Sequence, residues 1–286
     1  QRKEEIAARL TTSSVTWHDT VVTSVIANTG ISELITQIET LVASQATKGH
    51  NTRPRLFIDR VFSMKGSGTV VTGTLEGGNL EATSSLVVAR TGTAVRVREI
   101  QTHGSVVNVA QSGTRCAINL SGIDADELQR GDALVHENDW HMSNVFDARI
   151  KVLPALQHAL THRGSFTLHI GTRSQSATLR ILQTENIDPG QSGLVRIRFE
   201  HSLPLVPGDR FLVRDTGIGA TVGGGVILDV DPRSRVKDAA PDGSDEQILR
   251  DRGWLTVDEA RQLTGHDIAP IVGNWVTSAE TFRVTV

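Results

Sequence analysis

Two charged residues stand side by side inside an apolar stretch, and they are the first candidates for binding chemistry. Asp59 and Arg60 lie near the middle of residues 56–63, where the neighbouring side chains include Phe, Ile and Val. A charge in apolar surroundings needs an opposite charge or a ligand, because burying it alone is costly. The pair therefore belongs either to a structural ion pair or to a binding site.

The charged pair lies on the first strand of a predicted hairpin. Residues 56–63 and 69–76 are rich in β-branched and aromatic side chains, and a Lys-Gly-Ser-Gly turn joins them. Glycine accepts the positive φ that such a turn requires. Neighbouring residues of a regular strand point to opposite faces, so Asp59 and Arg60 can share one face only at a bulge or at a barrel rim.

The hairpin turn has the composition of a phosphate-binding loop but not its context. Residues 65–69 are followed by a predicted strand, whereas a phosphate loop opens a helix. The sequence contains no Gly-Lys pair, no Asp-x-x-Gly motif and no Asn-Lys-x-Asp motif. We therefore expect this chain alone not to hydrolyse GTP.

Short strands recur about every ten residues through the middle of the chain, which favours a barrel or a sandwich. A glycine cluster between residues 217 and 225 precedes the last of them and permits close approach of another backbone. The predicted strands are 56–63, 69–76, 86–90, 94–101, 105–109, 114–120, 145–152, 165–170, 177–183, 193–199, 210–214 and 221–230.

Several of these strands alternate apolar residues with arginine. Because alternate residues face opposite sides of a sheet, the arginines are expected to point away from the core. Apart from Arg115, we predict that these arginines lie on solvated strand faces, with contact to RNA phosphates as the alternative. The arginines placed outward in this way are Arg96, Arg98, Arg115, Arg196 and Arg198.

The two ends of the chain have helical patterns. Residues 4–10 and 31–43 are predicted helices, and residues 21–26 between them are predicted as a buried strand of an α/β unit. Near the C-terminus, Thr256 and Glu259 form a possible capping box at the start of a helix.

Composition limits the classes of protein that the chain can belong to. The net charge of −3 provides no overall basic field, so a nucleic-acid partner would require local arginine patches. The single Cys116 excludes an internal disulfide and suits a reducing, cytoplasmic location. No apolar run reaches the length of about 18 residues that spans a membrane. The N-terminus lacks Met and a signal peptide, so we expect a segment of a larger protein.

Residues 57–73, FIDRVFSMKGSGTVVTG, resemble the second domain of SelB-type selenocysteine-specific elongation factors, in the elongation factor Tu superfamily. Residues 113–120, 168–172 and 210–215 extend the resemblance. It implies a mainly β fold with two consecutive β-barrel domains of translation-factor type, an α/β remnant at the N-terminus and a partial winged-helix-like α segment at the C-terminus. The implied domains are 1–50, the end of a GTP-binding domain; 51–140 and 141–232, the two barrels; and 233–286, a linker and an incomplete winged-helix-like segment.

The resemblance also implies a function. Members of this family use GTP and Mg²⁺ to carry selenocysteyl-tRNA to the ribosome at recoded UGA codons, and C-terminal winged helices hold an mRNA hairpin. By position, Asp59, Arg60 and Arg115 line the aminoacyl pocket. For this chain alone the resemblance implies tRNA binding, with no cofactor, no metal and no membrane. The other expected tRNA contacts are Lys65, Arg96, Arg98, Arg210 and Arg214.

Charge can distinguish selenocysteine from serine, its precursor on the same tRNA. A selenol is a stronger acid than a thiol, whose pKa is about 8.5, so selenocysteine arrives as an anion while serine stays neutral. A guanidinium stays protonated and favours the anion. In the alternative interpretation, Asp59, Arg60 and Arg115 form only a structural ion-pair network.

Two other functions remain open from the sequence. The barrels could belong to another translational GTPase that binds ordinary or initiator tRNA, or to a cofactor-binding reductase module. The reductase module lacks support because no Gly-x-Gly-x-x-Gly fingerprint occurs between a strand and a helix. His158 and His162 are spaced like metal ligands on a helix, but without a nearby third ligand we interpret them as solvated.

Overall fold

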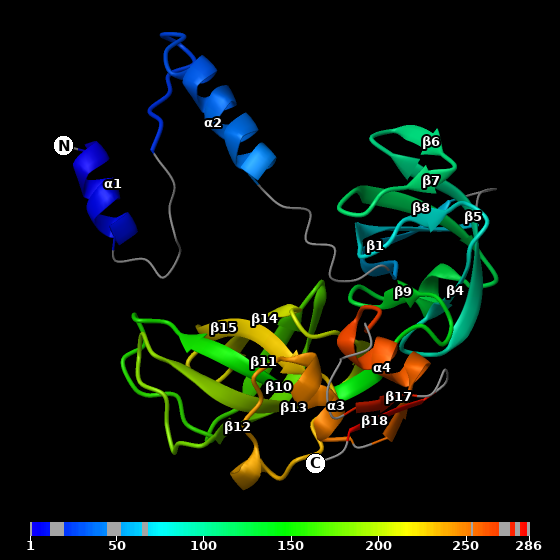
Figure 1. The fold of residues 1–286 in the computed structure, drawn as a ribbon. Coiled ribbons are helices and arrows are strands. Elements are labelled where there is room, and N and C mark those ends of the chain that lie inside the picture. The colour runs from blue at the N-terminus through cyan, green and yellow to red at the C-terminus, as the bar shows by residue number, and fades with distance from the viewer. Residues whose placement is uncertain are drawn as a thin grey trace. The chain divides into compact units, whose positions relative to one another are not determined.

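The computed structural model describes residues 2–11, 20–44, 53–64, 68–252, 254–268, 275–277 and 281–284. The chain divides into two compact units, Gln1–Gly49 and His50–Val286 (Figure 1). The second unit contains two β-barrels, so the predicted mainly β fold with two consecutive barrels is confirmed. Among the described residues, no helix has both the length and the apolar character needed to cross a membrane.

The described part of the first unit contains α1 (Arg2–Thr11) and α2 (Ile31–Ser44), so both predicted helices are confirmed. The predicted strand at residues 21–26 is wrong. Val25 and Ile26 lie in an exposed turn that a single bridge between Ser24 and Thr29 closes. A strand needs a neighbouring strand to bond with its N–H and C=O groups, and in the described part of this unit this segment bonds across only within its own turn, as from Ser24 to Thr29.

The first barrel is a closed ring of six antiparallel strands in the order β4-β9-β1-β2-β8-β5, closed by pairing of β4 with β5. As predicted, alternate residues of β5 and β8 point inward, and Val97, Cys116 and Ile118 are buried. The single strand predicted at residues 105–109 is instead two short strands in two sheets, because β6 extends β5 while β7 pairs with β3. The strands are β1 (Arg55–Met64), β2 (Gly68–Glu76), β3 (Leu80–Glu81), β4 (Ser85–Val88), β5 (Thr93–Thr102), β6 (Ser105–Val107), β7 (Val109–Ala110), β8 (Arg115–Ser121) and β9 (Ala133–Val135), with a 3-10 helix, η1 (Ala125–Glu127), before β9.

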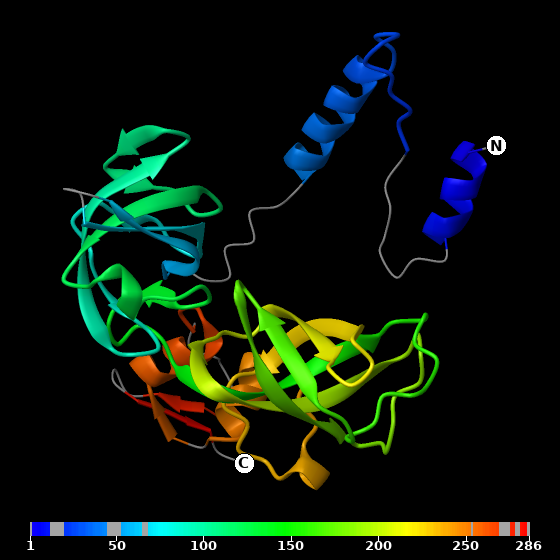
Figure 2. The same ribbon diagram turned by 180° about the vertical axis from the view of Figure 1, so that it is seen from behind.

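The second barrel is a closed ring in the order β10-β13-β12-β11-β14-β15, seen from behind in Figure 2. Its phenylalanines pack at its centre, with the ring of Phe146 5.7 Å from that of Phe199 and 5.2 Å from that of Phe211. The strands are β10 (Met142–Val152), β11 (Phe166–Ile170), β12 (Arg173–Leu182), β13 (Ser192–Pro204), β14 (Arg210–Asp215) and β15 (Ala220–Asp229).

The glycine cluster of β15 permits the close approach that the sequence predicted. A Cβ added to Gly225 would lie 2.0 Å from the carbonyl oxygen of Arg149 on β10. A Cβ added to Gly223 would lie 2.4 Å from the carbonyl oxygen of Lys151. Both contacts are with backbone, which cannot move without disturbing the β10–β15 pairing.

The C-terminal segment packs against the second barrel. It contains η2 (Val236–Asp238), α3 (Asp245–Arg250), α4 (Val257–Thr264) and a three-stranded sheet of β16 (Trp254–Thr256), β17 (Trp275–Thr277) and β18 (Thr281–Val284). The predicted capping box is confirmed. The Thr256 hydroxyl accepts a hydrogen bond from the backbone N–H of Glu259, and the Glu259 carboxylate accepts one from the backbone N–H of Thr256. Ile248 of α3 and Leu263 of α4 belong to the core of the second barrel.

A buried arginine joins the two barrels. The Arg55 guanidinium, at the start of β1, donates to both carboxylate oxygens of Asp209 on the second barrel at 2.7 and 2.8 Å. It also donates to Glu76 and to the carbonyl oxygen of Pro204 at 2.7 Å each. Trp140 covers it, with its ring centre 4.9 Å from the guanidinium carbon. Burial lowers the pKa of Arg55, but the two carboxylates raise it further, so Arg55 stays charged.

Replacing Asp209 with Asn should destabilise the second unit by about 3–5 kcal/mol, because Arg55 would remain buried with its main counter-charge removed. The control is Glu76→Gln, whose side chain is 47% exposed and whose loss should cost about 1 kcal/mol or less. Urea denaturation gives the free energy of unfolding of both variants. Equal costs for the two variants would contradict the assignment of Asp209 as the partner that holds the junction.

Gly225→Ala should cost about 3 kcal/mol, because the new methyl group overlaps backbone on β10. Gly219→Ala is the matched control: its φ is +67° with no atom within 4 Å of the added Cβ, so only the left-handed backbone is penalised, by about 1 kcal/mol. The two glycine variants are compared by the midpoints of their urea denaturation curves. A smaller loss for Gly225→Ala than for Gly219→Ala would show that β15 shifts to accept the methyl group.

Candidate functional site

A β-bulge places Asp59 and Arg60 on one face of the first barrel. Ile58 pairs with Gly73 on β2, and the next pair along the ladder is Arg60 with Thr72, so Asp59 is the extra residue. Directly opposed residues point to the same face, so the exposed Arg60 lies on the outer face of the barrel together with the half-buried Thr72. The bulge therefore resolves the alternation problem that the sequence left open.

Gly73 makes room for this bulge. A Cβ at Gly73 would lie 2.4 Å from the carbonyl oxygen of Phe57 and 2.6 Å from a methyl carbon of Leu56. A side chain at this position would push β2 away from β1 just before the extra residue. The spacing of Asp59 and Gly73 is thus a local requirement of the bulged hairpin.

Arg115 and Asp59 form an ion pair on the outer face. The Nη1 atom of Arg115 lies 2.6 Å from Oδ2 of Asp59, and Nη2 donates to Oδ1 at 3.1 Å. The hydroxyl of Thr72 donates to the same Oδ1, and Arg115 Nη2 lies 3.4 Å from that hydroxyl oxygen. The Asp59 side chain is 16% exposed and that of Arg115 56%, so the pair lies at the surface with its carboxylate the more enclosed group.

Arg60 differs from Arg115 in its contacts. Within the described part of the chain, the side chain of Arg60 makes no hydrogen bond or ion pair, and its backbone pairs with Thr72. It shares the outer face with Thr72, the residue opposite it on β2. The structure thus brings Asp59 and Arg115 into contact and leaves Arg60 exposed beside them.

The remaining predicted basic contacts are spread over the second unit. Arg96 is exposed and pairs with Ser121, at the opposite end of β8 from Arg115. Arg98 is the extra residue of another bulge and lines a cavity of about 350 Å³ that Asp124 and Glu127 also line. Arg210 and Arg214 are exposed on β14, where Arg214 donates to the carbonyl oxygen of Gly219. Lys65 lies outside the described residues.

The prediction that Arg196 is solvated is wrong. Its side chain is 4% exposed and its Nε donates to Asp147 at 2.6 Å, while Nη1 donates to the carbonyl oxygen of Ser234. The segment after β15 covers this part of the outer face of the barrel, which alternation along β13 could not reveal. Burial raises the pKa of Asp147, although the bond from Arg196 opposes the shift.

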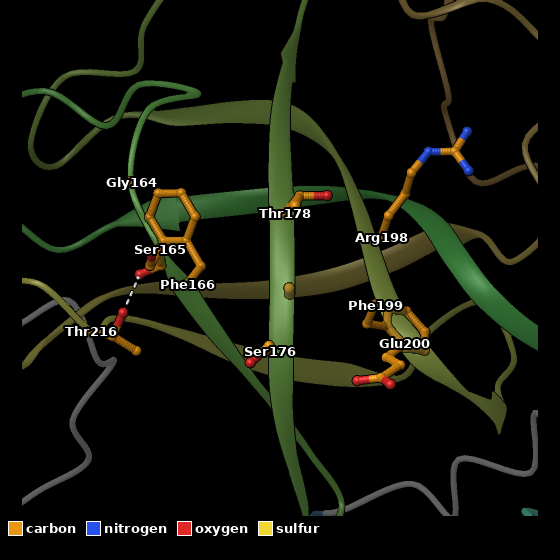
Figure 3. A pocket seen from close by; sticks show the side chains of 10 residues that line it. Gly164, Ser165, Phe166, Ser176, Thr178, Arg198, Phe199, Glu200 and Thr216 are labelled. Atoms are coloured by element: carbon orange, nitrogen blue, oxygen red, sulfur yellow. Dashed lines mark hydrogen bonds between the residues drawn. The ribbon is translucent and has the colours of Figure 1, made fainter.

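A hydroxyl-lined cavity lies on the second barrel, around β11, β12 and β13 (Figure 3). It has a volume of about 450 Å³, and Arg198, exposed as predicted, lines it opposite Thr178. Thr216 donates to the carbonyl oxygen of Ser165 at its edge. Hydroxyls beside one guanidinium can bind phosphate oxygens. The other lining residues are Gly164, Phe166, Ser176, Ala177, Phe199 and Glu200.

Thr72 and Arg55 hold important contacts that the residue pattern did not predict. Thr72 holds Asp59, and the available signal was its polar side chain at an outward position of β2. Arg55 joins the barrels, but in sequence it follows a polar linker and resembles any strand-edge arginine. His158 and His162 lie in the loop between β10 and β11, not on a helix. No group of three or more potential metal ligands occurs in the described part of the chain.

A family model described as "Selenocysteine-specific elongation factor, beta-barrel domain" matches residues 147–234, which form most of the second barrel. The selenocysteine-specific elongation factor of Desulfomicrobium baculatum is 34% identical over 275 residues, covering 91% of this chain and 43% of that protein. Elongation factor 1-alpha of Saccharolobus solfataricus is 29% identical over 201 residues, covering 62% of this chain and 45% of that protein.

Among solved structures, a bacterial selenocysteine-specific elongation factor has a similar fold, with a TM-score of 0.79 at 23% identity. The match covers 99% of this chain and 48% of that structure. The chain thus spans about half the length of the relatives it matches, for example 43% of the Desulfomicrobium protein.

Proposed function

Because this chain belongs to the SelB-type selenocysteine-specific elongation factors of the elongation factor Tu superfamily, we propose that its two barrels bind selenocysteyl-tRNA for delivery to the ribosome at recoded UGA codons. The observation that carries the proposal is the bulge at Asp59, which sets Asp59, Arg60 and Arg115 on one outer face of the first barrel. This face is the proposed aminoacyl pocket.

The pocket selects its cargo by charge. Asp59 and Arg115 cancel each other, and Arg60 adds a further positive charge, so the three side chains together carry a net positive charge. An ionised selenolate is attracted to this face, and a neutral serine hydroxyl is not. A charge-assisted hydrogen bond contributes about 1.5–3 kcal/mol, which corresponds to about ten- to a hundredfold in affinity.

The second barrel binds the acceptor arm of the tRNA. Its cavity between Ser165 and Arg198 offers hydroxyl donors and one guanidinium for a phosphate backbone, with the Glu200 carboxylate also at its lining. The exposed arginines Arg96, Arg98, Arg210 and Arg214, with Lys65, are proposed as further phosphate contacts. Such contacts position the RNA without reading its sequence.

The remaining steps of tRNA delivery require binding sites that the residues named above do not form. The family consists of GTPases, which act with Mg²⁺. The segment that joins β1 to β2 is followed by a strand where a phosphate-binding loop would open a helix, so we do not assign it to the phosphates of GTP. We propose that the full-length protein supplies GTP hydrolysis, contact with the ribosome and the mRNA hairpin-binding domains, in the cytoplasm.

A second candidate function is the binding of ordinary or initiator aminoacyl-tRNA. The similarity to elongation factor 1-alpha over 62% of the chain favours it as the alternative. A factor that carries ordinary amino acids has no use for an unpaired cation aimed at the amino-acid side chain. Arg60 and Arg115 therefore distinguish the two functions.

The chain should bind selenocysteyl-tRNA about ten to a hundred times more tightly than seryl-tRNA with the same tRNA body. Arg115→Ala should lower the ratio of the affinity for selenocysteyl-tRNA to that for seryl-tRNA, since Asp59 would be left without its counter-charge. Binding measured at about 50 and 200 mM salt separates the phosphate contribution, common to both tRNAs, from the pocket contribution. Equal affinities of the unaltered chain for both tRNAs would rule out the cargo assignment.

Arg198→Ala should weaken binding of both tRNAs equally and reduce the slope of log affinity against log salt by about one. The control is Arg250→Ala on the exposed side of α3, which should leave the slope unchanged. A change in the ratio of the affinities for the two tRNAs would contradict the assignment of Arg198 to the phosphate backbone.

A further inference from the structure

A second cavity on the second barrel, of about 610 Å³, lies where β12 ends and the segment after β15 passes over it. Arg235 and Lys237 of this segment line the cavity, and both residues are exposed. Among the described residues, neither side chain has a hydrogen-bond or ion-pair partner. The cavity therefore presents two cations that are available to an anionic ligand.

The segment that carries these two cations is held against the barrel at both ends. The buried Arg196 guanidinium, which Asp147 fixes, donates to the carbonyl oxygen of Ser234 at 2.8 Å. The side-chain amide of Gln183 donates to the carbonyl oxygen of Ala239 at 3.4 Å. The two basic side chains thus project from a backbone that is already in place, which lowers the entropy cost of binding a ligand there.

The outer face of β12 connects this cavity to the hydroxyl-lined cavity. Thr178 pairs with Arg198, and Arg180 pairs with Arg196, so these side chains share the outer face. Arg180 is exposed and lies two residues beyond Thr178, toward the second cavity. Figure 3 shows the Arg198 side chain on the opposite side of Thr178 from Ser165. Basic and hydroxyl groups therefore continue along β12 from one cavity to the other.

We call this row the β12 track, which consists of Thr178, Arg180, Thr184, Arg198, Arg235 and Lys237. Its four basic side chains outnumber the two carboxylates that line the cavities, those of Glu185 and Glu200. Cations and hydroxyls spread along a strand suit the successive phosphates of a nucleic acid backbone, because each phosphate needs its own donors.

The β12 track leads away from the first barrel. Thr172, which directly precedes β12, donates to the carbonyl oxygen of Ile58 in the first barrel at 2.6 Å. The strand then runs past the hydroxyl-lined cavity and ends at the second cavity. An RNA with its aminoacyl end on the first barrel therefore reaches Arg198 before it reaches Arg235 and Lys237.

We infer that Arg180, Arg235 and Lys237 bind phosphates of the tRNA acceptor arm that lie farther from its aminoacyl end than those at Arg198. The inference rests on the proposed function and adds a contact surface outside both the aminoacyl pocket and the hydroxyl-lined cavity. It also gives the segment between the second barrel and α3 a part in binding RNA.

The salt dependence of seryl-tRNA binding tests these contacts in the full chain. Arg235→Gln/Lys237→Gln should reduce the slope of log affinity against log salt by about two, and Arg180→Gln by about one, because each lost contact releases about one counterion fewer. The control, Arg130→Gln/Arg250→Gln, removes the same charge from exposed residues outside the β12 track and should leave the slope unchanged. Thermal unfolding confirms that each variant is folded.

The length of the RNA separates a contact at the far end of the β12 track from general attraction. The probes are RNA hairpins that copy the acceptor arm and are shortened stepwise from the end opposite the aminoacyl end. The longest hairpin should respond to Arg235→Gln/Lys237→Gln as the tRNA does. As the hairpins shorten, this response should disappear before the response to Arg198→Ala does.

Two results would overturn the inference. One is a slope for Arg235→Gln/Lys237→Gln equal to that of the control variant. The other is a response to this double variant that persists on hairpins too short to respond to Arg198→Ala. Equal affinities of the unaltered chain for selenocysteyl- and seryl-tRNA would instead overturn the cargo assignment, and the phosphate contacts of the β12 track would stand.

Discussion

The pairing of Arg55 with Asp209 is the contact on which the geometry of this protein depends. It neutralises a guanidinium that the junction of two barrels has removed from water, and the rings of Phe57 and Trp140 exclude solvent around it. A buried ion pair of this kind gains little net stability over an apolar pair, but it tolerates only one arrangement of its partners. The two barrels are thus held in a defined orientation.

This orientation extends directly to the proposed pocket. Phe57, two residues after Arg55, packs into the core of the second barrel, and a Cβ on Gly171 of that barrel would collide with its ring. The carbonyl of Ile58 accepts a hydrogen bond from Thr172 of the second barrel at 2.6 Å. The bulge residue Asp59 comes next. Its position is therefore anchored on one side by the second barrel and on the other by Thr72 and Arg115.

A second set of buried charges attaches the C-terminal helices to the same scaffold. Arg252, which follows α3, donates to Asp229 at the end of β15 at 2.7 Å, and both side chains are at most 3% exposed. Asp147 and Arg196 form a neighbouring buried pair across β10 and β13. Each of these charges would be costly alone, so the helices and the barrel stabilise one arrangement together.

The sequence by itself determined the features that depend on nearest neighbours along the chain. Alternation predicted the inward residues of β5 and β8, the Thr256–Glu259 spacing predicted a capping box, and the glycines of β15 predicted close backbone approach. The resemblance of residues 57–73 to one family supplied the number and type of barrels. Each of these signals lies within a short stretch of the sequence, either as a local pattern or as a complete motif.

Only the tertiary structure decided the features that depend on residues brought from far along the chain. The bulge at Asp59 is a property of the register between two strands, and alternation within one strand cannot show it. Arg196 follows the same pattern as Arg198, yet the segment after β15 covers one and leaves the other exposed. Residues 21–26 have the composition of a buried strand, but the described part of their unit contains no strand to pair with them. In each case the missing information was which backbone or side chain lies opposite, because pairing and desolvation are set by partners distant in sequence.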